Sequence, residues 1–123
     1  MALGKPEEAL RAINTYLERG PDKAWGWTEK GRILLEIGRP EAAVDATKES
    51  LRCDPLNSHA WNNLGICYVR LGRDRDAVGA LRKAIDCDPY NTGAMSELAF
   101  VLANNQMTSE PAELLLRALL TID

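Results

Sequence analysis

A fixed interval of 34 residues separates the punctuating residues of this chain, and it constrains the fold more than any other feature. Glycine and proline recur at this spacing in two series, which are Gly4, Gly38, Gly72 and Pro21, Pro55, Pro89. Alanine keeps the same interval at Ala9, Ala43 and Ala77. A single globular core has no reason to repeat in this way, whereas a stack of equal supersecondary units does. The period therefore predicts a solenoid.

Each period contains two helical patterns. In segment 58–91, apolar or small residues recur at three- and four-residue steps, at Ala60, Trp61, Leu64, Gly65, Tyr68 and Leu71. A second stripe follows at Ala77, Leu81, Ala84 and Ile85. Ser58 is placed to cap the first helix and Gly72 to end it, while Asp74 opens the second helix and Pro89 follows its end. The segment is thus predicted to form a helical hairpin.

Small and aromatic residues predict how the hairpins pack. Gly65 and Ala77 fall where the two helices should cross most closely, because bulk there would push their axes apart. Trp61 and Tyr68 supply large apolar area to the seam between helices. One hairpin cannot cover its own apolar face, so a stable array needs roughly three or more units.

These residues resemble the tetratricopeptide repeat, whose pattern is an aromatic residue, Leu-Gly, Tyr, and later Ala, a large apolar residue, Ala and Pro. Segment 58–91 matches it at Trp61, Leu64, Gly65, Tyr68, Ala77, Leu81, Ala84 and Pro89. Segment 24–57 keeps Trp27, Gly31, Leu34, Ala43 and Pro55. It departs from the pattern at Lys30, Thr47 and Ser50, and we expect looser packing there.

The resemblance extends over the whole chain. Segment 92–123 carries Met95, Leu98, Ala99, Leu102, Leu115 and Ala118, although Pro111 replaces the usual Ala. Segment 4–23 matches only the second helix of a repeat. The resemblance implies a single all-α domain over 1–123, a right-handed superhelical solenoid of antiparallel helix pairs with about seven helices. Its parts are 4–23, 24–57, 58–91 and 92–123.

The ends of the chain suggest exposed apolar surface. The first segment lacks its hairpin partner, and the last is apolar on more than one face, at Leu114, Leu115, Leu116, Ala118, Leu119, Leu120 and Ile122. Solenoid ends normally carry a polar cap. We therefore favour a fragment of a longer repeat array. The alternative is a small protein that forms homo-oligomers through its terminal helices.

The composition of the chain indicates which classes of partner and which cellular compartment to expect. The net charge of -3 argues against nucleic acid, which calls for a basic face. No apolar stretch approaches the ~20 residues that span a bilayer, and no signal-peptide pattern begins the chain, so a cytoplasmic location is expected. Cys53 and Cys87 are not expected to pair, because stacked helices stand ~8–10 Å apart and a disulfide needs Cα atoms within ~7 Å. Cys67 fits a small buried apolar residue.

The sequence offers little for catalysis. His59 is the single histidine, and no second histidine or cysteine is placed to complete a metal site with it. The carboxylates are scattered over helix caps and surfaces, and no phosphate-binding glycine pattern occurs. We therefore expect no enzyme activity, no metal and no cofactor.

The resemblance implies a concave groove, lined by the first helix of each unit, that holds an extended peptide or a partner's helix. In the first unit the corresponding positions are Trp25, Thr28, Glu29, Arg32, Leu35 and Glu36. In the second they are His59, Asn62, Asn63, Ile66, Val69 and Arg70, and in the third Ser96, Glu97, Phe100 and Asn104.

Each groove residue also has a simpler interpretation. Asn63 either bonds a partner's backbone or is solvated. Arg32 and Arg70 either clamp a carboxylate or pair with nearby glutamates, and the internal pairing is slightly favoured. Trp25 and Phe100 are either apolar anchors or parts of the seam between units.

One subtype of the family, the chaperone-binding members, uses a carboxylate clamp of Lys, Asn and Arg. The corresponding positions in this chain are Thr28, Arg32, Asn63, Gly93 and Glu97. Only Asn63 fits, and Glu97 would repel a carboxylate, so binding of chaperone tails is disfavoured. The predicted function is a non-catalytic interaction module or scaffold with a protein or peptide partner. The alternatives are a self-associating scaffold and an accessory domain of a larger enzyme.

Overall fold

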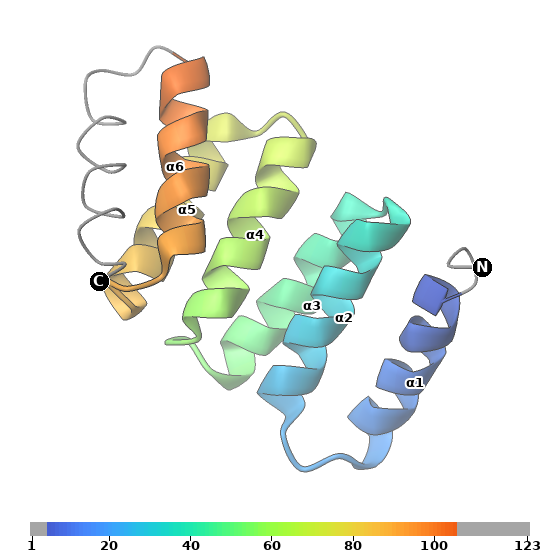
Figure 1. Ribbon diagram of the computed structural model, residues 1–123. Helices are drawn as coiled ribbons and strands as arrows, with labels where there is room; N and C mark the ends of the chain where they lie inside the picture. Colours follow the sequence, from blue (N-terminus) through green and yellow to red (C-terminus); the bar gives the residue numbers. More distant parts are fainter. Residues whose placement is uncertain (1–4, 106–123) are drawn as a thin grey trace.

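The fold is a chain of helical hairpins, seen in a computed structural model that describes residues 5–105. Within this range there are six helices and no strand (Figure 1): α1 (Lys5–Arg19), α2 (Lys23–Ile37), α3 (Pro40–Cys53), α4 (Ser58–Arg70), α5 (Asp74–Cys87) and α6 (Thr92–Asn104). The expected seventh helix and the apolar carboxyl-terminal segment lie outside the described residues.

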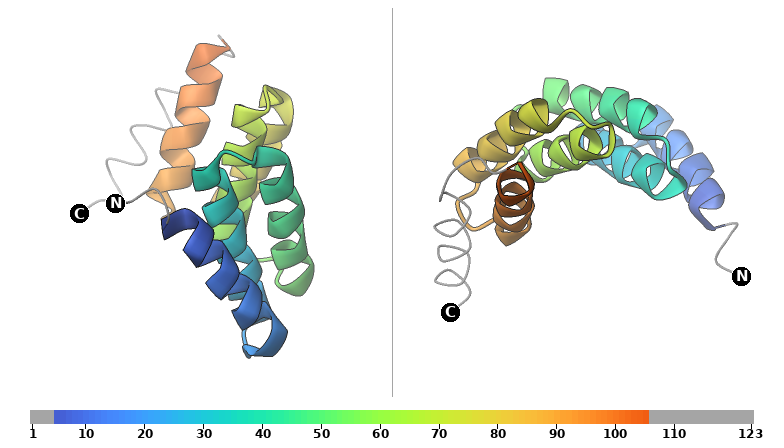
Figure 2. Two further views of the ribbon diagram at one scale, coloured as in Figure 1. Left: turned by 90° about the vertical axis from the view of Figure 1, so that its right-hand side faces the viewer. Right: turned by 90° about the horizontal axis from the view of Figure 1, so that it is seen from above.

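The helices form an arch with an inner and an outer layer. Seen from above, α2, α4 and α6 lie on the inside of the curve and α3 and α5 on the outside (Figure 2). Each helix packs on the next, and α2 also contacts α4, as α4 contacts α6. The predicted all-α solenoid of helix pairs is therefore confirmed.

An Asx residue caps the start of each inner helix. The side chains of Asp22, Asn57 and Asn91 accept hydrogen bonds from backbone N–H groups three residues later, at 3.0, 3.2 and 3.0 Å. The prediction that Ser58 caps α4 is wrong by one residue. Ser58 begins the helix, and its hydroxyl instead donates to the backbone oxygen of Ala84 in α5, at 2.8 Å.

Glycines end the inner helices α2 and α4 as expected. Gly38 and Gly72 have φ angles of 89° and 74°, in the left-handed region that L side chains rarely adopt. Asp54 and Asp88 follow the last residues of α3 and α5, ahead of the prolines, in extended conformations. The turns that the period predicted are therefore confirmed.

The helices of each hairpin cross closest at a glycine. A Cβ atom added at Gly65 would lie 2.6 Å from the fully buried side chain of Leu81. One added at the equivalent Gly31 would lie 2.5 Å from the hydroxyl of Thr47. Ala77 is also completely buried. The predicted close approach is confirmed at Gly65, and the burial of Ala77 agrees with it.

Two clusters of buried residues make up the core. One joins α2 and α3 to α4 and α5, and the other joins α5 to α6. Trp61 packs against both clusters, and Tyr68 is buried in the first, so both aromatic side chains contribute to the seam as predicted. The core therefore runs along the array without a break between units.

The polar residues of segment 24–57 do not open its hairpin. Thr47 and Ser50 are both completely buried, and their hydroxyls donate to the backbone oxygens of Ala43 and Ala24, at 2.7 and 2.9 Å. A buried hydroxyl costs little when it is hydrogen-bonded. The expected looser packing at these two residues is not observed.

The three cysteines are unpaired and differ in accessibility. Cys53 is exposed, Cys87 is partly buried and Cys67 is fully buried. Burial raises the pKa of the Cys67 thiol to about 11 from an ordinary value of 9.0, because the thiolate is poorly solvated there. The low reactivity expected of a buried structural thiol follows.

We predict that Cys53 reacts first with a thiol reagent at neutral pH. Because the thiolate is the nucleophile, the rise of the Cys67 pKa from 9.0 to about 11 lowers its own thiolate fraction at neutral pH by about 100-fold. Burial also keeps the reagent away from its sulfur. Labelling followed by peptide mass analysis measures the three rates separately. Labelling of folded Cys67 as fast as Cys53 would contradict this burial, and unfolded protein serves as the control in which all three react.

Candidate functional site

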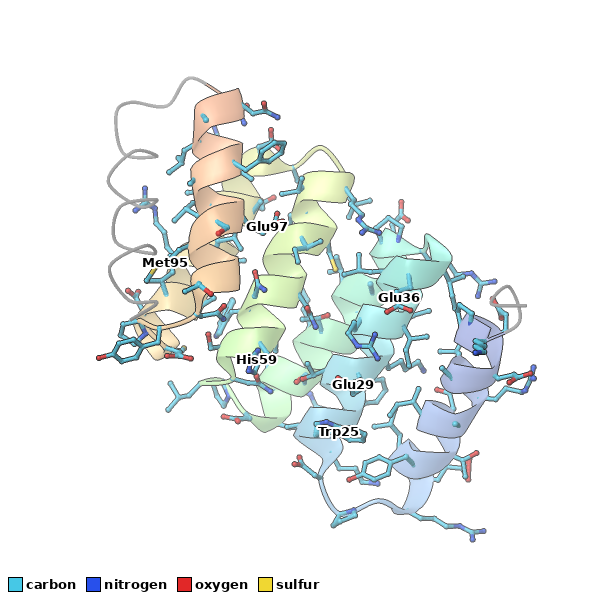
Figure 3. All side chains as sticks on the ribbon, viewed as in Figure 1. Trp25, Glu29, Glu36, His59, Met95 and Glu97 are labelled. Atoms are coloured by element: carbon cyan, nitrogen blue, oxygen red, sulfur yellow. The ribbon has the colours of Figure 1, made fainter. Side chains whose placement is uncertain are left out.

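A cleft of about 450 Å³ lies on the inner face between α2 and α4. Figure 3 shows Trp25, Glu29 and Glu36 along α2, with His59 at the neighbouring start of α4, all on the same side of the arch. The cleft is lined by Asp22, Ala24, Trp25, Thr28, Glu29, Arg32, Asp54, Asn57, His59 and Asn63.

The structure brings together six of the predicted groove residues in this cleft. Those that line it are Trp25, Thr28, Glu29, Arg32, His59 and Asn63. The others lie on α2, α4 and α6 but do not line the cleft, and are Glu36, Asn62, Ile66, Val69, Arg70, Ser96, Glu97, Phe100 and Asn104. Leu35, which the family pattern also placed in the groove, is a buried core residue.

Four lining residues were not among the predicted groove positions: Asp22, Ala24, Asp54 and Asn57. Asp22 and Asn57 are the caps of α2 and α4, and Asp54 lies in the turn before α4. The sequence signal that could have found them is the Asx residue ahead of each inner helix. Because an N-cap residue immediately precedes the first turn of its helix, it lies beside the groove that the helix lines.

Thr28 lies at the floor of the cleft, and its hydroxyl is already hydrogen-bonded within the protein. It is buried, and its hydroxyl donates to the backbone oxygen of Ala24 at 2.8 Å. The side-chain amide of Asn57 donates to the same hydroxyl at 3.2 Å, and Ser50 lies within hydrogen-bond distance. This buried network fixes α2, α3 and the start of α4 relative to one another.

The acidic side chains of the cleft are only partly neutralised. Arg32 forms an ion pair with Glu29 at 2.9 Å and a second one with Glu36. The hydrogen bond to Glu29, followed by the charges of both glutamates, raises the pKa of Arg32 above its ordinary value. The favoured internal pairing of Arg32 is thus confirmed, and the cleft's one arginine is already engaged.

Arg70 and Asn62 differ from expectation. Arg70 is exposed, but it donates to the backbone oxygen of Leu35 at 2.7 Å instead of pairing with a glutamate. The same carbonyl, near the end of α2, also accepts from the backbone N–H of Gly38 at 3.1 Å. The side-chain oxygen of Asn62 is buried and has no hydrogen-bond partner among the described residues. Asn63 donates weakly to the backbone oxygen of Thr28, at 3.5 Å.

Two aromatic side chains are exposed on the inner helices. Trp25 is 48% exposed, and its other side contacts Tyr16 of α1 edge-on, with ring centroids 5.0 Å apart. Phe100 on α6 is 57% exposed. Trp25 therefore belongs both to the seam with α1 and to the open cleft.

Neither a metal-binding cluster nor a membrane span occurs in the part of the chain that the structure describes. Between residues 5 and 105, no group of three or more metal-ligating side chains lies close together. None of the six helices is long and apolar enough to cross a bilayer. The lining of the cleft itself presents hydrogen-bonding groups, charged side chains and an aromatic ring.

The repeating hairpins and the cleft on their inner face define a helical-repeat solenoid. A tetratricopeptide repeat family model matches residues 1–58 and again 28–92. The chain belongs to the tetratricopeptide repeat family, whose members are generally non-catalytic modules for protein–protein interaction. The comparison with curated proteins finds no significant match.

Several solved structures share the fold at low sequence identity. A crystal structure of MamA superposes with a TM-score of 0.85 at 20% identity, over 97% of this chain and 70% of that one. MamA from Desulfovibrio magneticus RS-1 gives 0.84 at 22%, over 97% and 67%. The second TPR of Spaghetti (RPAP3), bound to the HSP90 peptide SRMEEVD, gives 0.77 at 17%, over 93% and 98%.

Proposed function

We propose that this chain is a protein-interaction module whose inner-face cleft holds an extended segment of a partner protein. The family supports a role in protein–protein interaction, and one structural neighbour, the RPAP3 domain, is bound to a peptide. The cleft offers what an extended segment needs: an exposed aromatic ring, amide groups and unneutralised charge. The predicted residues farther along α4 and α6 would extend the contact beyond the cleft.

The chemistry of the cleft favours a partner segment that carries a basic side chain. Asp22, Glu29 and Asp54 contribute three carboxylates to its lining, against the one guanidinium of Arg32, which two glutamates already engage. A lysine or arginine entering beside the exposed face of Trp25 would gain both charge attraction and a cation–π contact. The observation that carries the proposal is an exposed tryptophan ring in a cleft whose lining has more carboxylates than cationic groups.

The same chemistry argues against acidic tails. The peptide bound to the RPAP3 domain contains two glutamates and an aspartate, and the carboxylates of this cleft would repel such a sequence. In addition, Thr28 at a clamp position is buried and internally bonded, and Glu97 occupies another clamp position. We therefore expect chaperone tails of this type to bind weakly.

The test uses a short fluorescein-labelled peptide of alternating arginine and glycine, with a glutamate-for-arginine version for comparison. We predict that only the basic peptide binds, and that Trp25→Ala weakens its binding by about tenfold or more, as loss of an aromatic anchor does. Glu29→Gln should weaken it by a smaller factor, and added salt should weaken it further. Fluorescence anisotropy measures all of these affinities.

Tyr90→Ala is the matched control, because Tyr90 is also an exposed aromatic residue but does not line the cleft. It should leave the affinity unchanged. Equal binding of the acidic peptide, or unchanged binding by the Trp25 variant, would refute the proposal. Size measurement over a concentration series tests the rival self-associating scaffold, which requires a particle that grows with concentration.

A further inference from the structure

The outer face of the arch carries two furrows that the repeat makes equivalent. One lies between α1 and α3 over α2, and the other between α3 and α5 over α4. Trp27 lies in the first furrow, and Trp61, 34 residues later, lies in the second. Further pairs with the same offset are Asn14 and Lys48, Leu34 and Tyr68, Asp45 and Gly79, Ala46 and Ala80, and Glu49 and Lys83. The two furrows can therefore be compared position by position.

The furrow between α3 and α5 is the more open of the two. It measures about 490 Å³, against about 360 Å³ for the furrow between α1 and α3. At Gly79, in the middle of α5, an added Cβ atom would meet nothing within 4 Å, whereas the equivalent position in α3 holds Asp45. A helix-interior glycine is less stable than alanine, and close packing gives no reason for this one. Its effect is to leave the furrow open.

The floor of this furrow is apolar and aromatic. The side chains of Leu51, Trp61 and Tyr68 line it. The indole N–H of Trp61 already donates to the backbone oxygen of Pro55 at 2.8 Å, so the ring offers an apolar face without an unmet polar group. In the furrow between α1 and α3, the equivalent ring of Trp27 has the ammonium of Lys30 over it, 5.2 Å from the ring centre.

The rim of this furrow is basic. Lys48, Arg75 and Lys83 line it, and the ammonium of Lys83 lies 5.9 Å from the centre of the Trp61 ring. Its one carboxylate, Asp76, forms an ion pair with Arg73 at 2.8 Å. At the position of Lys83, the other furrow has Glu49. The repeat has thus produced one outer furrow with a positive rim.

We infer that the furrow between α3 and α5 is a second binding site, distinct from the inner cleft, for an acidic peptide segment with one large apolar side chain. The apolar side chain would enter the space left by Gly79 and lie against Trp61. The flanking carboxylates would meet Lys48, Arg75 and Lys83. The module would then hold two partner segments of opposite charge on its two faces.

The probe is a short fluorescein-labelled peptide in which a central leucine is flanked on both sides by glutamates. We expect it to bind the unmodified chain and to bind Gly79→Leu at least about tenfold more weakly, because the new side chain fills the space that the anchor needs. Gly79→Leu meets no neighbour within contact distance at its Cβ, so it is expected to fold. Lys83→Glu and added salt should both weaken binding.

Asp45→Leu is the control, because it places the same new side chain at the equivalent position of the other furrow. It should leave the affinity unchanged, as should Trp25→Ala in the inner cleft. Circular dichroism and thermal unfolding verify that each variant is folded. The inference fails if the peptide does not bind, if Gly79→Leu binds it normally, or if Trp25→Ala abolishes binding. A dimer that Gly79→Leu dissociates would also overturn it, since a second copy would then occupy the furrow.

Discussion

Gly65→Leu is expected to lower the free energy of unfolding by about 3 kcal/mol, at the upper end of the cost of overpacking a core. A Cβ atom there would already lie 2.6 Å from the buried side chain of Leu81, and the rest of a leucine has no room between α4 and α5. The helices would have to separate and expose the core cluster that they share with α2 and α3. Urea denaturation followed by circular dichroism measures the loss.

A double-variant cycle shows whether the contact with Leu81 is the cause. Gly65→Ala and Leu81→Ala should each destabilise the chain, the second by about 2–5 kcal/mol for a buried leucine. Together they should cost less than their sum, because the shortened residue 81 leaves space for the new methyl group. Gly79→Ala is the control, since an added Cβ atom there meets open space and should stabilise α5 by up to about 1 kcal/mol. Strict additivity of the pair would contradict the proposed clash.

Asn91→Ala should cost about 2 kcal/mol, because one side chain satisfies two groups. Its oxygen accepts from the backbone N–H of Ala94 at 3.0 Å, and its amide donates to the hydroxyl of Ser58 at 2.7 Å. Loss of an N-cap alone costs about 1 kcal/mol, and a partly buried hydrogen bond between units adds a similar amount. Thermal unfolding of the variant measures the sum.

Asn91→Asp separates the two contributions. The aspartate keeps the capping oxygen but cannot donate to Ser58, whose own hydroxyl proton is directed to the backbone oxygen of Ala84. The aspartate variant should therefore lose only the stability that the hydrogen bond between residue 91 and Ser58 contributes. If Asn91→Asp is as unstable as Asn91→Ala, the cap contributes nothing, and if it is as stable as the unmodified chain, the link contributes nothing.

The sequence predicted the hairpins because their determinants are local and periodic. The turns at Gly38 and Gly72 and the crossing at Gly65 follow from residue type and spacing alone. The cap of α4 was misplaced because Asn57 and Ser58 are both good capping residues, and only the backbone geometry shows which one precedes the helix. The close packing around Thr47 was missed because the sequence does not show that its hydroxyl finds a carbonyl.

The candidate sites were less predictable, because they depend on side chains brought together from different helices and turns. The cleft gains Asp22 and Asp54 from turns that the family pattern does not place in the groove. The bond from Arg70 to Leu35 depends on the distance between α4 and α2. The outer furrow had one sequence signal, which is that Gly79 is a helix-interior glycine without a counterpart one period away.

The capping asparagines also bear on how the array unfolds. The side-chain amide of Asn57 donates to Thr28 of α2, and that of Asn91 donates to Ser58 of α4. The caps of α4 and α6 are therefore each hydrogen-bonded to the preceding inner helix. A helix that frays at its start therefore loosens its predecessor as well. In a linear array, such nearest-neighbour links set the cooperativity of unfolding. Units 24–57 and 58–91 should accordingly exchange their most protected amide hydrogens at similar rates, through a shared opening rather than one by one.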